Sequence, residues 1–451
     1  MEYKSIIENY DFQAPNSCYI SIFGKDIIQE SKTLIKPNQS NDEIKKIIFD
    51  SISMRIRELF RADNFSILTG AGSSFNIGGV LFSKKELELT GWVGSIFNDN
   101  TNELKEEYNE LLKLYENHLE NKNCYGVEDF ITFLVKLEYC LNKGGIIELE
   151  IKNKKTNCSD KVSKIKNLIL DKLTKSCALP VKEKQDALEQ TKTFIKRILS
   201  RPVNLRRTNL FTTNYDLAFE KSMDGLGVIY VDGFIGGLKK YFHPEAFNFD
   251  FYYPSSTTEG KVSRLERVLH FYKLHGSLNW VVSDDNSFMN VYNIEKKESE
   301  IIEYKQNLII YPTPMKENDT LGYPYSELFR RFANTIQQPQ SVLLTYGYSF
   351  GDPHINRIIF EALSIPSFQL IIISHSWSDN IKNIYNKYKN EPSIGFIIGE
   401  EFAKWDIFVK NILPDFPSQD LEEQYQTKRS KARTLNEELN LPIITEKKNN
   451  E

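Results

Sequence analysis

Five short turns along the chain combine glycine with polar side chains directly after apolar runs. The first turn, Gly70 to Ser74, follows the β-rich run Phe65 to Thr69. Glycines in a strand-to-helix turn let the backbone approach a pyrophosphate, whose charge the amides of the following helix favour. The third glycine of the usual dinucleotide motif is missing, because position 75 is Phe. Taken alone, this turn also fits an ordinary structural loop.

The second turn, Thr212 to Asp216, ends another apolar run and precedes a helical segment. In an open parallel sheet the carboxyl ends of the strands are where ligands bind, so its polar side chains are candidate ligand contacts. Helix capping is the structural alternative, since Asn or Asp before a helix satisfies its free amides. Only one residue can be the cap, so capping explains only part of this run.

The remaining three turns are His275 to Trp280, Gly347 to Asp352 and Ser374 to Ser376. Each follows a short apolar run and contains small or polar residues. A histidine at a strand end suits a general base or a ribose-hydroxyl contact near neutral pH, although a single histidine is more often structural. The five turns together predict a site built from several strand ends.

The elements that would position these turns are short apolar strands alternating with helices. The helical period is clear in Ile44 to Phe60 and in Ile355 to Leu363. This alternation predicts an α/β fold, a Rossmann-like parallel sheet covered by helices on both faces. The strand candidates are Phe65–Thr69, Asn209–Thr213, Gly227–Val231, Phe271–Leu274, Leu308–Tyr311, Val342–Tyr346, Gln369–Ser374 and Ile394–Ile398.

A different pattern between the first two turns predicts a helical insertion. Two apolar stripes of helical period lie there, and lysines crowd the other faces from 143 to 184. The predicted organisation is an N-terminal extension and helix over 1–60, a Rossmann-like domain over 61–100 and 201–410, a helical insertion over 101–200 and a polar tail over 411–451.

Taken in chain order, the turns resemble the sirtuin superfamily. The chain departs from its protein deacylases, because it has no zinc module of two Cys-x-x-Cys pairs and reads Phe75 to Val80 where they carry Pro-Asp-Phe-Arg. The runs Thr212 to Asp216, His275 to Trp280 and Gly347 to Asp352 are similar to those of bacterial sirtuin-like NAD hydrolases of anti-phage systems. The resemblance implies an NAD glycohydrolase that consumes NAD as its substrate during infection.

The resemblance also implies roles for individual residues. Asn214 would hold the attacking water or a ribose hydroxyl, and His275 would act as base or ribose anchor. Asp216 would contact the nicotinamide carboxamide or order its loop, with helix capping as an equal alternative. The NAD-binding residues are then Gly70, Ala71, Gly72, Ser73, Ser74, Thr213, Asp216, Gly276, Ser277, Gly347, Ser349 and Ser374.

Composition excludes several other classes of protein. The formal net charge of −4 argues against wholesale nucleic-acid binding, which usually requires a strongly basic domain. The five cysteines form no close pairs, so we expect reduced, buried thiols and neither a disulfide framework nor a metal site. The N-terminal residues do not resemble a signal peptide, and no apolar run is long enough to cross a bilayer. A cytoplasmic protein is expected.

Two functional alternatives stay open at this point. One is an NAD-dependent protein deacylase, and the other is a non-catalytic subunit that senses NAD or ADP-ribose. Because an unregulated NAD hydrolase would kill its host, the chain needs a switch, and the residues after Ser374 are too few for a sensor domain of ordinary size. We therefore expect a homo-oligomer and a separate activating or scaffolding protein, for which relatives use, among others, a HerA-type ATPase.

Overall fold

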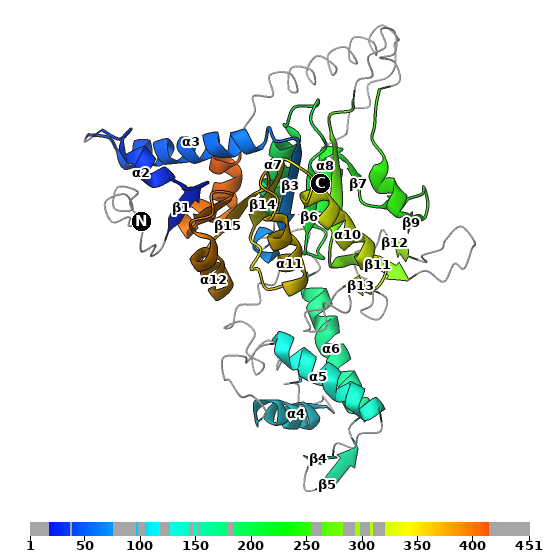
Figure 1. Cartoon of the computed structure of the whole chain (residues 1–451). Coiled ribbons are helices and arrows are strands. Elements are labelled where there is room, and N and C mark those ends of the chain that lie inside the picture. Colours follow the sequence, from blue (N-terminus) through cyan, green and yellow to red (C-terminus); the bar gives the residue numbers. More distant parts are fainter. Residues whose placement is uncertain are drawn as a thin grey trace, which may run out of the picture.

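The apolar runs form the centre of a nine-stranded sheet in the computed structural model of the chain (Figure 1). In spatial order its strands are β2 (Lys25–Asp26), β1 (Tyr19–Ile22), β16 (Ile394–Ile398), β15 (Gln369–Ser374), β14 (Ser341–Tyr346), β3 (Asn64–Thr69), β6 (Asn209–Thr212), β10 (Val268–Lys273) and β7 (Ile229–Val231). The strands from β16 to β7 run parallel. β1 and β2 extend one edge in antiparallel pairing.

The structure describes part of the chain, and the statements below concern that part. The described residues are 18–36, 38–74, 96–97, 104–117, 127–143, 148–151, 154–157, 159–177, 185–253, 264–282, 294–297, 307–309 and 321–414. Among them, no helix combines the length and the apolar run that crossing a membrane requires. Cys18 is buried, as predicted, whereas Cys140 is exposed, contrary to prediction, because it lies on the outer face of its helix.

The parallel strands are apolar because helices cover both of their faces. β14 is buried at every position, and β3 at every position after the first. Parallel strands require such cover, since their crossover helices lie against the sheet. The predicted α/β fold, a Rossmann-like parallel sheet with helices on both faces, is confirmed.

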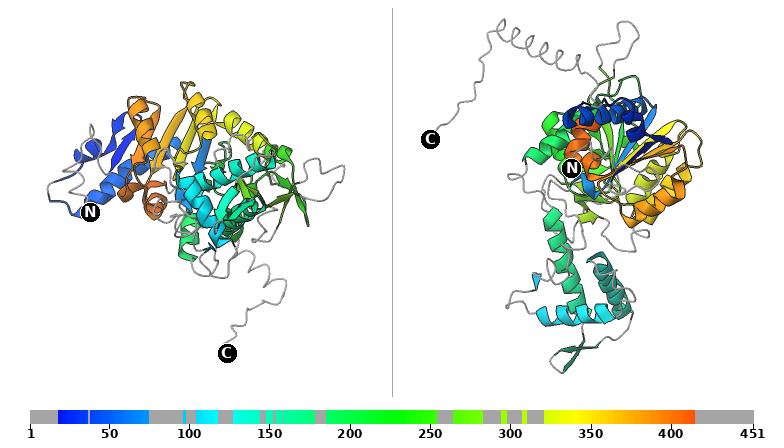
Figure 2. Two further views of the ribbon diagram at one scale, coloured as in Figure 1. Left: turned by 90° about the horizontal axis from the view of Figure 1, so that it is seen from below. Right: turned by 90° about the vertical axis from the view of Figure 1, so that its left-hand side faces the viewer.

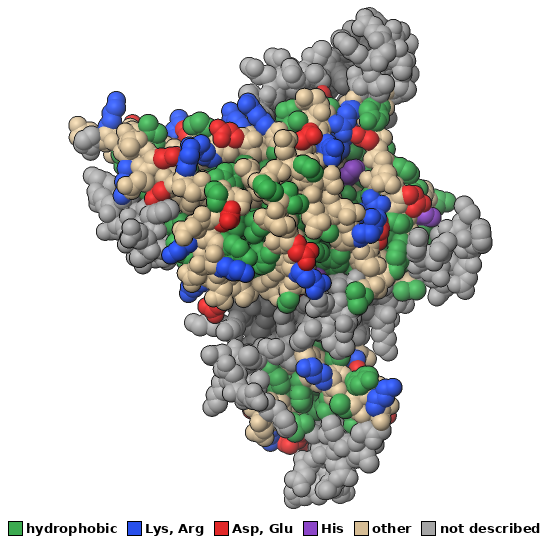
Figure 3. Space-filling model, in the orientation of Figure 1, with side chains coloured by type: hydrophobic (Ala, Val, Ile, Leu, Met, Phe, Trp, Pro, Cys, Tyr) green, Lys and Arg blue, Asp and Glu red, His purple; other side chains and the backbone are tan. Residues whose placement is uncertain are grey.

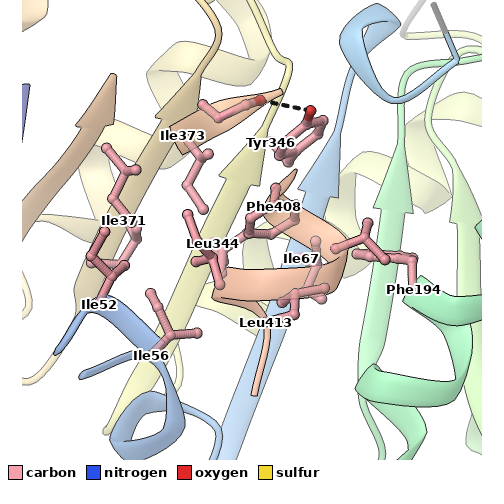
Figure 4. Close-up of a cluster of buried hydrophobic side chains, with 14 of the residues drawn as sticks. Ile52, Ile56, Ile67, Phe194, Leu344, Tyr346, Ile371, Ile373, Phe408 and Leu413 are labelled. Carbon is pink, nitrogen blue, oxygen red and sulfur yellow. Dashed lines mark hydrogen bonds between the residues drawn. The ribbon is translucent and has the colours of Figure 1, made fainter. Parts of the chain in front are cut away.

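One face is covered by α3 (Asn41–Leu59), α7 (Gln185–Leu199), α8 (Ala218–Leu226) and the segment after β16. α3 begins at a capping box in which Ser40 and Glu43 satisfy each other's amides, and it buries a stripe that includes Ile52 and Ile56. Figure 4 shows these two side chains facing Leu344 and Ile371 of the sheet. The segment after β16 forms α13 (Glu400–Ala403), α14 (Trp405–Ile407) and a π-helical turn (Phe408–Ile412), and Phe408 stacks on Tyr346.

The other face is covered by α10 (Tyr325–Ile336), α11 (Pro353–Ala362) and α12 (Asp379–Tyr388). Leu328 and Phe332 of α10 are completely buried, as is Ile355 of α11. They share one hydrophobic cluster with Leu343 and Ile372 of the sheet. α2 (Ile27–Lys32) packs separately, against α3 and β1.

A small antiparallel sheet lies next to the β10–β7 edge (Figure 1). Its strands are β13 (Asn307–Ile309), β11 (Gly276–Val282), β12 (Ile294–Lys296), β9 (Lys240–Phe242) and β8 (Phe234–Ile235). The strand expected at Leu308–Tyr311 is therefore present, but it pairs antiparallel with β11 and does not join the parallel sheet. The chain after His275 continues as a strand of this second sheet rather than as a helix.

A helical subdomain forms a separate lobe below the two sheets in the view of Figures 1 and 3 and is seen from other sides in Figure 2. Tyr215, which follows β6, packs against its core. The subdomain contains α4 (Lys105–Asn117), α5 (Val127–Asn142), the hairpin β4 (Glu148–Ile151) with β5 (Lys154–Asn157), and α6 (Ser159–Cys177). Its own core joins residues of all three helices, such as Leu111, Phe130 and Ile165. Two of its lysines pair with acids of neighbouring helices, Lys161 with Glu107 and Lys166 with Glu138.

Two elements outside the predicted Rossmann-like domain belong to the large sheet or its core. β1 lies in the region expected as an N-terminal extension, yet it pairs with β16 in the large sheet. α7 lies in the region expected as the helical insertion, yet its Phe194 packs in the core of the sheet. The domain boundaries themselves stay predictions.

Candidate active site

The five predicted turns follow five neighbouring strands of the large sheet. β15, β14, β3, β6 and β10 lie side by side in this order, and all of them run parallel. Their carboxyl ends form one continuous edge, which is where open α/β sheets bind ligands. Along this edge lie, in spatial order, Ser374, Gly347, Gly70, Asn214 and His275.

The glycines of the first and fourth turns allow these two turns to touch. The Gly72 amide donates to the Gly347 carbonyl oxygen over 3.1 Å. A Cβ on Gly70 or Gly72 would lie 2.7 Å from backbone atoms of Gly347, and Gly347 itself has a left-handed φ of 58°. Contact between the turns is therefore one reason for these glycines. Residues 75–80, where the sequence departs from the deacylases, lie outside the described residues.

Asn214 connects the second turn to the first. Its buried side-chain Nδ2 lies 2.8 Å from Ser74 Oγ, 3.0 Å from Ser73 Oγ and 3.0 Å from the Gly70 carbonyl oxygen. The two amide hydrogens are thus used to hold the Gly70 turn. Among the described residues, none donates a hydrogen bond to Asn214 Oδ1. This oxygen is the atom with which Asn214 can hold a water or a hydroxyl.

The neighbours of Asn214 fix the second turn in place. The Thr213 amide donates to the Thr69 carbonyl oxygen over 3.0 Å, which ties the end of β6 to the end of β3. The Asp216 carboxylate accepts from the Ala218 amide at the start of α8 over 2.9 Å. The N-cap of α8 is Leu217, so Asp216 lies one residue before the cap, and its carboxylate orders the turn that leads into the helix.

His275 and Asn214 follow the ends of adjacent strands because of the strand register. Thr212 is paired with Lys273, and the Leu274 amide donates to the Thr212 carbonyl oxygen over 2.9 Å. Asn214 comes two residues after Thr212, and His275 comes two residues after Lys273. Both therefore lie just beyond the ends of adjacent strands. His275 is buried, with 5% of its surface exposed.

Two residues from α11 and its N-cap complete the surroundings of His275. Its ring centroid lies 5.6 Å from that of His354. A potential metal ligand atom of His275 lies within 4.8 Å of one from Asp352 and one from His354, and these two also lie within 4.8 Å of each other. All three residues are buried. In the sequence, Asp352 only ends the fourth turn, and His354 has no predicted role. Their separation from His275 in the chain leaves no local motif that would have found them.

A buried ion pair lies just below this edge. Lys273 Nζ lies 2.7 Å from Glu220 Oε1 of α8 and 2.8 Å from Ser277 Oγ. Ser277 Oγ in turn donates to Asn279 Oδ1 over 2.9 Å. The Ser277 hydroxyl, predicted as an NAD contact, is thus engaged in a buried network that joins α8, β10 and β11.

The remaining predicted contacts differ in accessibility. Gly276 has a left-handed φ of 80°, which the turn between β10 and β11 requires. Ala71 and Ser349 are exposed at the edge. Ser374 Oγ donates to the Ser376 carbonyl oxygen over 2.9 Å, and its lone pairs stay available for a ligand.

A cavity of about 330 Å³ lies next to the buried ion pair and contains none of the predicted site residues. Lys296, which lines this cavity, pairs with Asp232 over 2.6 Å. Burial lowers the pKa of Lys296, but the attraction of Asp232 outweighs burial and raises this pKa above its usual value. The residues that line the cavity are Leu217, Glu220, Lys221, Asp224, Tyr230, Gly237, Leu238, Lys240, Asn279, Lys296 and Lys297.

Comparison with known proteins connects this edge with one family. Residues 208–393 match the family described as SIR2-like domain, and this segment includes Asn214, His275 and Gly347. No curated protein matches the chain. Among solved structures, the crystal structure of a SIR2 homologue in complex with NAD is similar to this chain. The two are 12% identical in sequence with a TM-score of 0.36, and the match covers 80% of this chain and 93% of the other.

A second solved structure is a triple mutant of Sir2 homologues in complex with 2'-O-acetyl ADP ribose. It is 14% identical with a TM-score of 0.36, and the match covers 80% of this chain and 95% of that one. The likeness to the family lies in the matched segment and in the ordered turns of the sheet. Over residues 208–393 the chain is therefore similar to the SIR2-like domain family, which supports a sirtuin-like fold and indicates NAD-related activity.

Proposed function

We propose that this chain binds NAD along the carboxyl edge of the large sheet and hydrolyses its nicotinamide–ribose bond to give nicotinamide and ADP-ribose. The observation that supports this most is the position of Asn214 and His275 on adjacent strand ends, each two residues beyond the Thr212–Lys273 pair. The Gly70 turn, held by Asn214 Nδ2, supplies the third part of the site.

The proposed chemistry relies on positioning and electrostatics. Nicotinamide in NAD is already a cationic leaving group, so its departure needs no strong acid. The barrier arises from the positive charge that develops at the anomeric carbon and from the need to place a water on the opposite face of the ribose. Asn214 Oδ1 holds the water or a ribose hydroxyl, and His275 accepts a proton from the water or anchors the ribose.

The other turns along the edge bind the rest of NAD in this proposal. The Gly70 to Ser74 turn lies at the pyrophosphate, where the Ala71 amide favours negative charge. The other four amides of the turn donate to carbonyl oxygens of the chain. Ser349 and Ser374 lie further along the edge, at the adenosine half. Asp216 is assigned to ordering the loop, because its carboxylate accepts from the Ala218 amide.

The decisive experiment follows NAD and its products by mass spectrometry with the full-length chain. Asn214→Ala and His275→Ala should each lower the rate of NAD hydrolysis by about 10²–10³-fold, the usual cost of removing a positioned polar group. His243→Gln is the matched control, because this histidine lies between β9 and a short 3-10 helix and pairs with Glu245. Hydrolysis at the parent rate by both alanine variants would refute the assignment.

The same measurement separates the two alternatives. A deacylase releases nicotinamide only when an acetylated peptide is present and forms an acetylated ADP-ribose product. A sensor binds NAD in equilibrium dialysis without any turnover, also with its partners present. Peptide-independent release of nicotinamide together with free ADP-ribose supports the hydrolase.

We also propose that this activity depletes NAD in anti-phage defence, as a homo-oligomer that a separate activating or scaffolding protein switches on. A HerA-type ATPase is one such partner. The support is the likeness of three turns to those of bacterial sirtuin-like NAD hydrolases. Light scattering and co-purification from the native host test the assembly, and the NAD content of infected cells tests the role. A monomer that hydrolyses NAD at full rate alone would refute both the partner and the oligomer.

A further inference from the structure

His275, Asp352 and His354 form a buried cluster of metal-ligating side chains at the end of β10. Their exposed fractions are 5%, 8% and 3%. One ligand atom from each lies within 4.8 Å of the other two. Two imidazole rings and one carboxylate gathered away from solvent are a costly arrangement unless hydrogen bonds or a cation compensate for the lost hydration.

The backbones that carry the cluster are held firmly. Asn356 of α11 donates to the Phe350 carbonyl oxygen over 2.9 Å and accepts from Tyr348 Oη over 3.0 Å. The Tyr348 hydroxyl also lies 3.4 Å from the Asp352 carbonyl oxygen. The turn that leads into α11 is therefore fixed on both sides of Asp352.

The side chain of Asp352 is oriented in an unusual way for its position. Asp352 is the N-cap of α11, where an aspartate normally accepts a hydrogen bond from an amide of the first turn. Its side chain makes no such cap hydrogen bond. The carboxylate instead lies with the two imidazole rings, and Phe329 contacts both rings at centroid distances of 6.4 Å and 5.0 Å.

We propose that His275, Asp352 and His354 form a binding site for a divalent transition-metal ion of the Zn²⁺ type. Imidazole nitrogen and carboxylate oxygen are the ligands that such ions prefer, and three protein ligands leave one coordination position open. Zn²⁺ binds these atoms at about 2.0–2.2 Å, which places neighbouring ligand atoms about 3.3–3.6 Å apart. The ligand atoms lie within 4.8 Å of one another, so they need to approach by side-chain rotation to reach this spacing.

Metal binding and NAD hydrolysis exclude each other at this site. A coordinated His275 nitrogen has no lone pair left with which to accept a proton or a ribose hydrogen bond. A bound ion therefore inhibits the reaction, and this consequence rests on the function proposed above. Binding of the ion itself does not depend on that function.

Binding is measured by equilibrium dialysis of the chelator-treated full chain against Zn²⁺ or Co²⁺, with the metal content read by mass spectrometry. Because Cys140 is exposed, the background carries Cys140→Ser, and the Co²⁺ spectrum must lack a thiolate charge-transfer band. We expect one ion per chain. Asp352→Asn and His354→Gln should each bind at least about 10-fold more weakly, as loss of a ligand or its support typically costs 10–100-fold. His243→Gln should bind like the parent.

Folding is checked by thermal unfolding without metal. If one variant fails to fold, the other variant tests the site. Metal should raise the unfolding midpoint of the parent but not that of the folded variant. Absence of a bound ion, or equal affinity in the parent and a folded variant, overturns the site.

A second assay separates the metal site from the proposed function. Zn²⁺ should inhibit NAD hydrolysis by the parent, chelator should restore it, and His354→Gln should require at least about 10-fold more Zn²⁺ for the same inhibition. Hydrolysis unaffected by a bound ion overturns the inhibition. If dialysis detects the ion but no condition gives NAD hydrolysis, the proposed function fails while the metal site stands.

Discussion

Nδ2 of Asn214 lies 2.8 Å from Oγ of Ser74, so the candidate catalytic asparagine holds the glycine turn of the neighbouring strand. The same nitrogen lies 3.0 Å from Ser73 Oγ and from the Gly70 carbonyl oxygen. An amide nitrogen has two hydrogens, so three acceptors surround two donors. Loss of one acceptor still leaves a partner for each hydrogen.

This geometry predicts different effects for Ser74→Ala and Asn214→Ala on NAD hydrolysis. Ser74→Ala removes one of three acceptors and should lower kcat/KM by less than about 10-fold, since a hydrogen bond typically contributes 0.5–1.5 kcal/mol. Asn214→Ala also removes Oδ1 and should cost about 10²–10³-fold. Steady-state kinetics with NAD measure both. Equal losses in the two variants would mean that Asn214 acts only by holding the turn.

Contact between the two glycine turns predicts a large cost for Gly347→Ala. An alanine there adopts a left-handed φ of 58°, which costs about 1–2 kcal/mol. Its Cβ also lies 2.6 Å from Gly72 Cα, and such overpacking costs about 1–3 kcal/mol more. Gly227→Ala is the matched control, because Gly227 has a φ of 62° and nothing within 4 Å of the added Cβ. Urea unfolding should show a larger loss of unfolding free energy for Gly347→Ala, and equal losses would contradict the close contact.

The buried Lys273–Glu220 pair predicts a strong dependence of stability on both partners. The two side chains are 3% and 7% exposed, so Lys273→Met leaves the Glu220 carboxylate buried without its cation. We expect a loss of about 3–5 kcal/mol in the free energy of unfolding. Lys192→Met removes a more exposed pair with Glu189 and should cost less than about 1 kcal/mol.

A double variant tests the pairing itself. Lys273→Met combined with Glu220→Gln should lose less stability than the sum of the two single variants, because the second change removes the unpaired charge. Denaturant unfolding of the four proteins gives this coupling. Additive losses would show that the two groups do not interact.

Burial of His270 predicts that stability falls at acidic pH. Burial lowers the pKa of His270, the Phe249 carbonyl oxygen and Asp250 oppose this effect, and Arg207 and Arg331 add to it. Below the unfolded value of about 6.5 the unfolded chain binds a proton that the folded chain does not bind, so the free energy of unfolding decreases as the pH falls. His270→Gln should flatten this decrease in thermal unfolding between about pH 7.5 and 5.5. An equally steep decrease in His270→Gln would show that another group causes it.

The sequence alone predicts the α/β class, most strands of the large sheet and the helices that cover it. These features follow from local patterns, since a strand buried on both faces must be apolar along its length and a covering helix must repeat its apolar residues every three to four positions. The turns after the strands are equally local, because glycine and short polar side chains mark where an apolar run stops.

Only the tertiary structure decides which of these turns meet. The order β15-β14-β3-β6-β10 brings Gly347 against Gly72 and places Asn214 and His275 after adjacent strands, although these residues are far apart in the chain. It also joins Asp352 and His354 to His275 and places β13 in the second sheet. Strand pairing depends on the long-range burial of whole elements, so no local spacing of residues encodes it.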